Sequence, residues 1–350
     1  MCKLGDYGKV VTGNTPPTKD VENYENGTFL WASPADLGTI KSISETKTML
    51  SAKGFSKTRA LPKGSVLITC IGSTIGKTGM ATKEMSTNQQ INSIVVNDNS
   101  DNEFVYYAIQ SAFPRYLSSI AVQAVPIISK SAFELLPNQR PCLQEQKKIG
   151  KFLSLLDDRI ATQNKIIDKL QSLIKGIAQK IVHSNKTNVH LSECVECSSS
   201  TLQESDVCEH GAYPVYGANG IVGYLDNYNT EDEAVYIIKD GSGVGTVSYV
   251  TGKCSATGTL NTLQAKEGYS LQYLYYLLKV FNFEPYKTGM AIPHIYFKDY
   301  GKAKFFCPSY TEQLQYAQSL SAIDSKLLVE KNILTSLSMQ KKYLLRQMFI

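Results

Sequence analysis

Two long stretches of the chain repeat apolar residues in alternating steps of four and three. The first stretch, 141–183, has no proline after Pro141, and its apolar series is Ile149, Leu153, Leu156, Ile160, Ile167, Leu170, Ile174, Ile177 and Ile181, broken at Gln163. The second stretch, 308–350, carries Tyr316, Leu320, Ile323, Leu327, Leu334, Leu337, Leu344 and Met348, with breaks at Glu330 and Lys341. Steps of four and three place these side chains along one seam of a helix, which is typical of a coiled coil.

The pattern therefore predicts two long helices that pair with each other. A helix of this length, about 60 Å at 1.5 Å per residue, is longer than a domain of ordinary size, so packing on its own domain alone would leave much of the seam exposed. Gln163 and Glu330 occupy matching seam positions, and Ser309 with Glu312 forms a capping box at the start of the second helix. We expect the pairing residues to be Leu153, Leu156, Ile160, Ile167, Leu170, Leu320, Ile323, Leu327, Leu334 and Leu337.

The segments around these helices repeat one another. A shift of 169 aligns GSTIG (72–76) with GSGVG (241–245), INSI (91–94) with LNTL (260–263), and FVYYAI (104–109) with YLYYLL (273–278). A shift of 167 aligns Pro126 with Pro293 and PCLQEQ (141–146) with PSYTEQ (308–313). Blocks in the same order at a nearly constant offset indicate that the chain contains two copies of a domain followed by a helix.

The short runs of Val, Ile, Thr and Tyr in each copy predict strands, and 101–113 and 270–281 each predict one short helix. The expected fold class is α+β, with a first domain at 1–140, a helix at 141–183, a second domain at 184–307 and a helix at 308–350. Because the second domain connects the end of one helix to the start of the other, we expect the helices to be antiparallel, with one domain at each end. An extra stretch near 40–57 has no match in the second copy.

Composition and charge narrow the class of protein. The 350 residues are 43% hydrophobic and 19% charged, as in ordinary folded proteins, and no basic-apolar leader or membrane-length apolar run is present. We therefore expect a cytoplasmic protein without a membrane partner. The net charge of +5 is uneven, because 1–140, 141–183 and 308–350 are basic, whereas 184–307 is acidic. A nucleic-acid partner is compatible with the basic segments.

The sequence GSTIGKT (72–78) resembles a phosphate-binding loop without matching it. Such a loop needs a glycine five residues before Gly76, with four residues between them, and Ile71 stands at that place. The second copy keeps the glycines and replaces Lys77-Thr78 by Thr246-Val247. We therefore expect the glycines to supply positive φ in a tight connection between strands, close to a partner's backbone.

The sequence motifs give only weak support for zinc binding, nuclease activity or methyltransferase activity. Cys194, Cys197, Cys208 and His210 could form a zinc site, but a second Cys-x-x-Cys is missing, so free thiols are expected for the eight cysteines. Asp36 followed by Glu45-Thr46-Lys47 loosely matches a metal-dependent nuclease, and NTPP (14–17) does not fit an amino-methyltransferase loop. We expect no catalytic residues and no metal in this chain. A non-catalytic scaffold whose domains bind protein remains an alternative.

Several motifs together resemble the specificity (S) subunit of type I restriction-modification systems over nearly the whole chain. They are KLGDYGKVVTGNTPP (3–17), PCLQEQKKIGKFLSLLDDRI (141–160), YPVYGANGIVGYLDNY (213–228) and GMAIPHIYFKD (289–299). The resemblance implies a DNA-recognition subunit in which each domain reads one half of a split double-stranded target and the helices set the gap. Two modification (M) subunits would dock on the helices and use S-adenosylmethionine, and restriction (R) subunits would add ATP- and Mg-dependent cleavage. No cofactor would be held by this chain.

Residue type and placement suggest the DNA contacts. Phosphates are bound by Lys, Arg, Ser, Thr and backbone amides, and base edges by Asn, Gln, Arg and Lys. The candidates in the first domain are Lys77, Thr78, Asn88, Gln89, Gln90 and Lys130, and those in the second are Thr257, Thr259, His294, Tyr296 and Lys298. Because Thr257-Gly258-Thr259 replaces the amides Asn88-Gln89-Gln90, we expect the two domains to read different bases.

Overall fold

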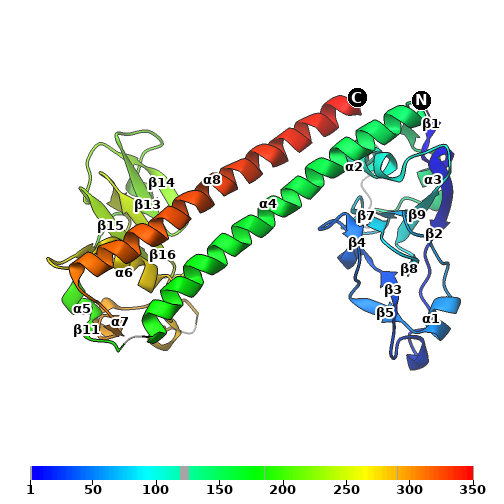
Figure 1. Ribbon diagram of the computed structural model, residues 1–350. Helices are drawn as coiled ribbons and strands as arrows, with labels where there is room; N and C mark the ends of the chain where they lie inside the picture. Colours follow the sequence, from blue (N-terminus) through cyan, green and yellow to red (C-terminus); the bar gives the residue numbers. More distant parts are fainter. Residues whose placement is uncertain (1, 119–125, 185, 290, 350) are drawn as a thin grey trace. The chain divides into compact units, whose positions relative to one another are not determined.

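The computed structural model describes residues 2–118, 126–184, 186–289 and 291–349 (Figure 1). By its internal contacts the chain divides into two compact units, Met1–Thr162 with Leu334–Ile350, and Gln163–Ile333. Each unit contains one α+β domain and a part of each long helix. Among the described residues, no helix is both long and apolar enough to span a membrane.

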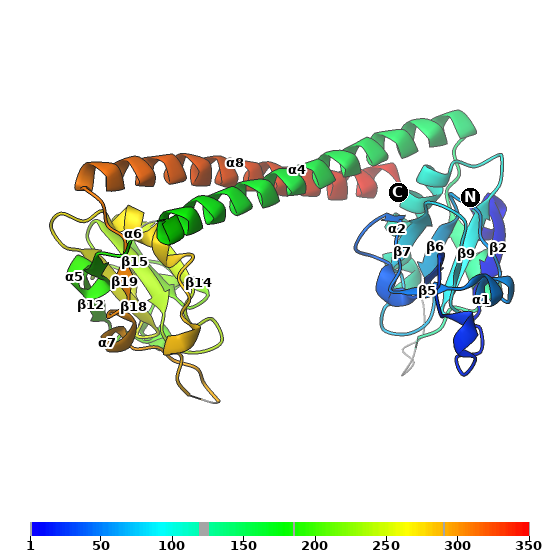
Figure 2. The ribbon, with the colours of Figure 1, turned by 60° about the horizontal axis from the view of Figure 1, so that its bottom comes forward.

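Domain 1, the part of the first unit before residue 141, is built on a five-stranded sheet. The strand order is β2-β9-β6-β7-β4, with bounds Gly8–Thr12, Ile91–Val96, Val66–Thr69, Thr78–Ala81 and Ser42–Ile43. The apolar run of β6 is buried at every residue, as expected for a central strand. α2 (Asn102–Ser118) packs on β6 and β7, as the turned view in Figure 2 shows.

The other elements of domain 1 are short. A three-stranded sheet has the order β5-β3-β8, with bounds Thr48–Leu50, Phe29–Ala32 and Met85–Thr87. The remaining elements are β1 (Cys2–Lys3), paired with β10 (Pro137–Asn138), the helices α1 (Ala52–Ser56) and α3 (Lys130–Leu135), and the 3-10 turns η1 (Leu4–Tyr7), η2 (Val21–Asn23) and η3 (Pro34–Asp36).

Domain 2, residues 186–307, has the same plan. Its main sheet has the order β12-β18-β15-β16, with bounds Val195–Ser199, Leu260–Ala265, Glu233–Ile238 and Val247–Thr251, and α6 (Leu271–Leu278) packs on β15 and β16. A smaller sheet has the order β14-β13-β17, with bounds Gly220–Leu225, Tyr213–Gly217 and Ser255–Ala256. The remaining elements are β11 (Val189–His190), paired with β19 (Lys304–Phe305), α5 (Leu191–Cys194), η4 (Glu204–Asp206), η5 (Glu284–Tyr286) and α7 (Phe297–Tyr300).

The internal repeat extends to single hydrogen bonds. In domain 1, Gln146 Nε2 donates to Pro141 O (2.8 Å), and its Oε1 accepts from Asp101 N (3.1 Å). In domain 2, Gln313 Nε2 donates to Pro308 O (2.9 Å), and its Oε1 accepts from Ser270 N (2.9 Å). Both glutamines are buried and tie the start of a long helix to the start of the short helix in its own domain. The predicted duplication is confirmed.

The extra stretch of domain 1 lies earlier than the sequence suggested. β3 pairs parallel with β8 and antiparallel with β5, and β13 pairs parallel with β17 and antiparallel with β14, so β5 and β14 are counterparts. The connection from β3 to β5 comprises residues 33–47, whereas β13 and β14 are joined by Ala218 and Asn219 alone. The expected stretch near 40–57 therefore overlaps this insertion at 40–47, but β5 within that range does have a counterpart.

The long helices are α4 (Leu143–Ser184) and α8 (Tyr310–Met348). In the first unit, Asp157 forms an ion pair with Lys341 (2.5 Å), and Leu153 shares an apolar cluster with Leu344 and Phe349. In the second unit, Gln163 contacts Glu330, and further along α4 Ile174 and Ala178 line a cavity with Asp324 and Leu327 of α8. Within each unit, residue numbers rise on one helix as they fall on the other, so the segments are antiparallel. All ten residues expected to pair the helices are buried or half-buried, and the predicted fold class is confirmed.

A polar layer interrupts the seam in the second unit. Gln163 Nε2 donates to Glu330 O (3.1 Å) and to the Glu330 carboxylate. Lys326, one turn earlier on α8, forms an ion pair with the same carboxylate. The lysine, and then the amide of Gln163, lower the pKa of Glu330 below its ordinary value. A buried polar pair of this kind favours one register, since a slip would leave the carboxylate without partners.

Candidate nucleic-acid interface

The glycine turn of domain 1 connects β6 to β7 and lies against two polar segments. Gly72 and Gly76 have φ of 89° and 90°, which confirms that the glycines supply positive φ. Gly72 N donates to Pro126 O (3.0 Å), and Cys70 N donates to Gln90 O (2.7 Å). These bonds bring three sequence-distant segments together: 72–77, 88–90 and 126–130.

Domain 2 repeats the arrangement around the turn between β15 and β16. Gly241 and Gly245 have φ of 95° and 89°. Gly241 N donates to Pro293 O (3.0 Å), and Lys239 N donates to Thr259 O (3.0 Å). The corresponding segments 241–246, 257–259 and 293–298 are thus brought together in the same way. Each domain presents one such loop cluster, and the sequence candidates lie in or beside it.

The turn of domain 1 is not built to hold a phosphate. Its amides bond within the loop, from Ile75 N to Gly72 O (3.1 Å), from Gly76 N to Thr69 O (2.9 Å) and from Lys77 N to Thr74 O (3.2 Å). A phosphate loop instead directs its amides toward the ligand. A Cβ on Gly76 would lie 2.7 Å from Phe113, so the glycine is required by close packing as well as by φ.

The six candidates of domain 1 differ in exposure. Gln89 and Lys130 are exposed, and Lys77 and Gln90 are half-buried. Thr78 and Asn88 are buried, at 3% and 8% exposure, so their side chains are not presented to a ligand. Asn88 Nδ2 donates to Gln90 Oε1 (3.1 Å), and Asn88 Oδ1 accepts from Gln90 N (3.0 Å). Asn88 therefore orients Gln90, and the surface chemistry is left to Lys77, Gln89, Gln90 and Lys130.

The five candidates of domain 2 divide similarly. Thr257 is buried at 1% exposure and shares a hydroxyl hydrogen bond with the half-buried Thr259 (2.8 Å). His294 is half-buried, and Tyr296 and Lys298 are exposed. The Tyr296 ring lies edge-on to His294 at 5.3 Å, and Lys298 Nζ lies 5.2 Å from the centre of the same ring. An aromatic ring between two groups that can carry positive charge offers both stacking and charge to a nucleic acid.

Sequence reasoning missed the segment 12–15, which contacts Gln89, and the residues that bond to this segment. Thr15 Oγ1 donates to Gln89 Oε1, and Trp31 Nε1 donates to Asn14 O (3.1 Å). The exposed Arg59 donates to Thr12 O (2.7 Å), and its backbone N donates to Asn14 Oδ1 (3.0 Å). An arginine and an amide pair are typical base-reading groups. No local pattern links 12–15 to 59 and 89, because they meet only through the tertiary fold.

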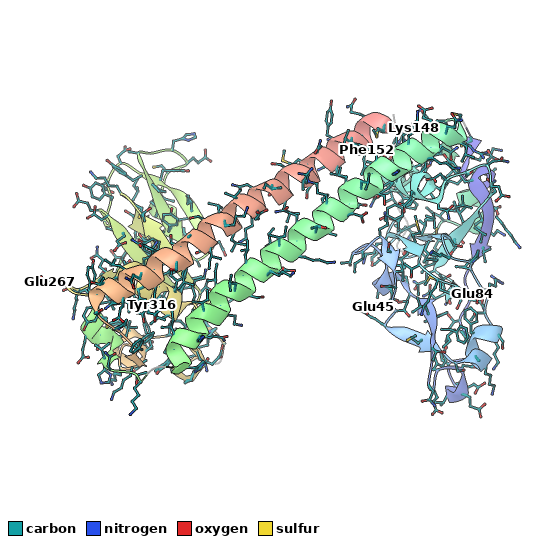
Figure 3. All side chains as sticks on the ribbon, viewed as in Figure 1. Glu45, Glu84, Lys148, Phe152, Glu267 and Tyr316 are labelled. Carbon is teal, nitrogen blue, oxygen red and sulfur yellow. The ribbon has the colours of Figure 1, made fainter. Side chains whose placement is uncertain are left out.

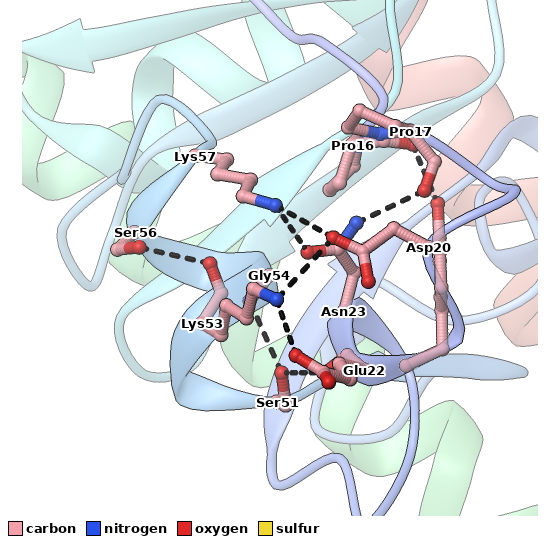
Figure 4. Close-up of polar contacts among 11 residues, drawn as sticks. Pro16, Pro17, Asp20, Glu22, Asn23, Ser51, Lys53, Gly54, Ser56 and Lys57 are labelled. Carbon is pink, nitrogen blue, oxygen red and sulfur yellow. Dashed lines mark hydrogen bonds and ion pairs between the residues drawn. The ribbon is translucent and has the colours of Figure 1, made fainter.

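A polar cluster fixes this loop to the rest of domain 1 (Figure 4). Lys57 Nζ donates to Asp20 Oδ2 and to Asn23 Oδ1, both at 2.9 Å, and the buried Asn23 donates to Pro17 O (2.9 Å). Lys53 forms further ion pairs with Asp20 (3.5 Å) and Glu22. These two lysines are neutralised within the cluster, so we assign them to positioning the 14–24 loop rather than to DNA.

The alternative metal sites lack the required geometry. Among the described residues, no three His, Cys, Asp or Glu side chains converge as metal ligands. The Sγ atom of Cys194 lies 3.9 Å from the Sγ atom of Cys307, which is not one of the expected zinc ligands. Burial raises the pKa of the Cys197 thiol to about 11, and this disfavours the thiolate form that zinc binds. Asp36 lines a cavity of about 310 Å³ with Glu45 and Lys47, but its carboxylate accepts bonds from Ser33 N (2.8 Å) and Lys47 N (2.9 Å).

Comparison with known proteins identifies the family. The model of the type I restriction modification DNA specificity domain matches residues 1–172 and 184–339. The type I restriction enzyme MjaIX specificity subunit of Methanocaldococcus jannaschii is 30% identical over 177 residues, or 48% of this chain and 40% of that protein. The EcoprrI specificity subunit of Escherichia coli is 21% identical over 348 residues, covering 89% of this chain and 84% of that subunit.

A solved structure has the same fold. The type I restriction-modification S subunit from M. genitalium superposes with a TM-score of 0.69 at 19% identity, covering 99% of this chain and 95% of that one. The family match falls on both copies of the repeat, each with its loop cluster and its following helix. The chain therefore belongs to the type I restriction-modification DNA specificity family.

Proposed function

We propose that this chain is the sequence-recognition subunit of a type I restriction-modification complex, in which each domain reads one half of a bipartite DNA target. The observation that supports this most directly is the repeated loop cluster with different polar side chains. The same three segments meet in both domains, and the amides at 89 and 90 in one correspond to Gly258 and Thr259 in the other. The same backbone arrangement carrying different side chains in the two domains is suited to reading two half-sites of different sequence.

In domain 1, we assign base contacts to Gln89 and Gln90 and a supporting contact to Arg59. Gln can form two hydrogen bonds with adenine in the major groove, and Arg two with guanine. Lys77 and Lys130 are suited to phosphates. In domain 2, we assign base or stacking contacts to Thr259, His294 and Tyr296, and a phosphate contact to Lys298.

Exposed apolar residues on the long helices suit docking of M subunits. Phe152 and Leu155 on α4 are 45% and 57% exposed, and Leu328 and Tyr343 on α8 are 61% and 62% exposed (Phe152 is labelled in Figure 3). Phe152 and Leu155 lie three residues apart on one face of α4, and neighbouring exposed apolar side chains of this kind can bind a partner. In this proposal, two M subunits bring S-adenosylmethionine, R subunits bring ATP and Mg²⁺, the helices set the gap between half-sites, and the complex acts in the cytoplasm.

The test is co-expression with the M subunit, followed by mapping of methylated adenines in the host DNA. The double variant Gln89→Ala with Gln90→Ala changes the sequence read in one half-site only, since each lost bidentate contact costs about 1–3 kcal/mol of discrimination. The variant Lys298→Ala weakens methylation with no change in the first half-site.

Glu84→Gln changes an exposed acid of domain 1 that is not among the predicted contacts (Glu84 is labelled in Figure 3), and as the matched control it leaves the target unchanged. If the double glutamine variant alters both halves of the target, or neither, the assignment of domain 1 to one half-site is wrong.

A further inference from the structure

The two domains differ at one edge of their main sheets. In domain 1, β4 pairs parallel with β7 (Ser42 with Met80, Ile43 with Ala81), and Met80 N donates to Lys41 O (2.7 Å) (β4 and β7 in Figure 1). β7 corresponds to β16 in domain 2, since each follows the glycine turn and pairs antiparallel with the central strand. β16 forms the edge of its sheet. An edge strand presents backbone groups that can pair with a further strand.

The inserted segment 33–47 also delivers a lysine into a polar site of domain 1. Lys41 Nζ donates to Glu103 Oε2 (2.9 Å), Ser154 Oγ (2.8 Å) and Tyr107 OH (3.3 Å). The Tyr107 hydroxyl in turn donates to Asp157 Oδ2 (2.6 Å). The Lys41 side chain is only 14% exposed, so the insertion fills this site from within the chain.

Domain 2 repeats the walls of this site without the lysine. The counterparts of Glu103, Tyr107, Ser154 and Asp157 under the repeat are Gln272, Tyr276, Ser321 and Asp324. All four line a cavity of about 540 Å³, together with Tyr249, Thr251 and Tyr275. Tyr276 OH donates to Asp324 Oδ2 (3.2 Å), as Tyr107 does to Asp157. Because Ala218 and Asn219 replace the insertion, domain 2 has no residue corresponding to Lys41.

A lysine from a different element also approaches this aspartate in each domain. Asp157 has Lys341 at 2.5 Å in addition to the Lys41 network. Asp324 has Lys279 at 3.9 Å, with its ammonium 5.0 Å from the Tyr275 ring centre. Lys331 of α8 also lines the cavity, but neither Lys331 nor Lys279 corresponds to Lys41 under the repeat, because the insertion that carries Lys41 is absent from domain 2.

We propose that this cavity, formed by Gln272, Tyr276, Ser321 and Asp324, receives a lysine or arginine side chain from an extended segment of the M subunit, which pairs with the edge of β16. The proposal rests on the proposed function for the identity of the partner. Strand addition supplies main-chain hydrogen bonds, and the cavity selects the side chain. A carboxylate beside tyrosine rings attracts a cation and repels a phosphate, so DNA is a poor occupant. Lys41 and β4 show within the same molecule how the site is filled.

Two measurements on the full-length chain test this. Asp324→Asn keeps a hydrogen-bond acceptor and removes the charge, and it lowers the affinity for purified M subunit about tenfold, the effect of losing one partner of a partly buried charge pair. The matched control is Glu267→Gln, an exposed acid of domain 2 (Figure 3), which leaves the affinity unchanged. Calorimetric titration measures both.

The second measurement is amide hydrogen exchange with and without M subunit. Exchange slows in 247–251, at the edge of β16, and stays the same in 78–82, where β4 already covers β7. If the wild-type chain binds M subunit but Asp324→Asn binds equally well, or 247–251 shows no added protection, the proposed contact is wrong. Equal added protection in 78–82 would also overturn it. If the wild-type chain binds no M subunit, the proposed function fails first, and the partner named here fails with it.

Discussion

Two glycines in the turn of domain 1 allow the free-energy cost of a strained backbone conformation to be measured separately from the cost of a steric clash. Gly72 and Gly76 lie in the same turn with nearly the same φ, 89° and 90°. A Cβ added at Gly72 would meet only Gln90 Nε2, at 3.8 Å, whereas one added at Gly76 would lie 2.7 Å from Phe113, which is 2% exposed and cannot turn away. The substitutions Gly72→Ala and Gly76→Ala therefore share the free-energy cost of placing an alanine at positive φ. Only Gly76→Ala adds the cost of a steric clash with Phe113.

The left-handed conformation costs an L-residue about 1–2 kcal/mol, and an overpacked core site adds about 1–3 kcal/mol. We expect Gly72→Ala to lower the unfolding free energy of domain 1 by about 1–2 kcal/mol and Gly76→Ala to lower it by about 2–5 kcal/mol. The single tryptophan, Trp31, is 9% exposed and lies in domain 1, so its fluorescence during urea unfolding reports on this domain. Equal losses in the two variants, or a larger loss for Gly72→Ala, would refute the packing argument.

Two further predictions concern the long helices. Leu153 is fully buried and Leu155 is 57% exposed, so Leu153→Ala costs about 2–5 kcal/mol while Leu155→Ala stays within about 0.5 kcal/mol, measured by the same urea unfolding of Trp31. The pKa of Glu330 is lowered in the folded chain, so its pairing contributes stability above the ordinary pKa of 4.5 that is lost as the pH falls through the lower folded value. Lys326→Met removes the main cause of that shift, and acid unfolding followed by helical circular dichroism then begins at higher pH. An unchanged acid transition would contradict the assigned role of Lys326.

The helices and the duplication could be predicted because they depend on periodicity and internal identity, which are properties of the sequence. The apolar steps from Ile149 to Ile181 identify a seam without any knowledge of the partner, and the matching breaks at 163 and 330 align the two copies. The two glycine turns could be predicted for the same reason, since both copies keep the glycines while Thr246-Val247 replaces Lys77-Thr78 in the second.

The finer features of the candidate site required the tertiary fold. Thr78 and Asn88 are polar residues of the expected types, but nothing local indicates that strand packing buries them. Thr15 contacts Gln89, and Arg59 bonds to the neighbouring Asn14, only because loops distant in sequence converge. The bounds of the insertion 33–47 could not be predicted, because alignment of short, divergent strands does not reveal strand pairing. Its role as an extra edge strand carrying Lys41 became visible only through the sheet order.

The measurement that tests the central claim most directly is the map of methylated adenines in cells that express the wild-type chain with its M subunit. Two similar recognition domains predict a split motif, in which two short specified sequences flank a gap of constant length and unspecified sequence. A single continuous motif, or methylation without sequence preference, would contradict the claim that each domain reads its own half of the target.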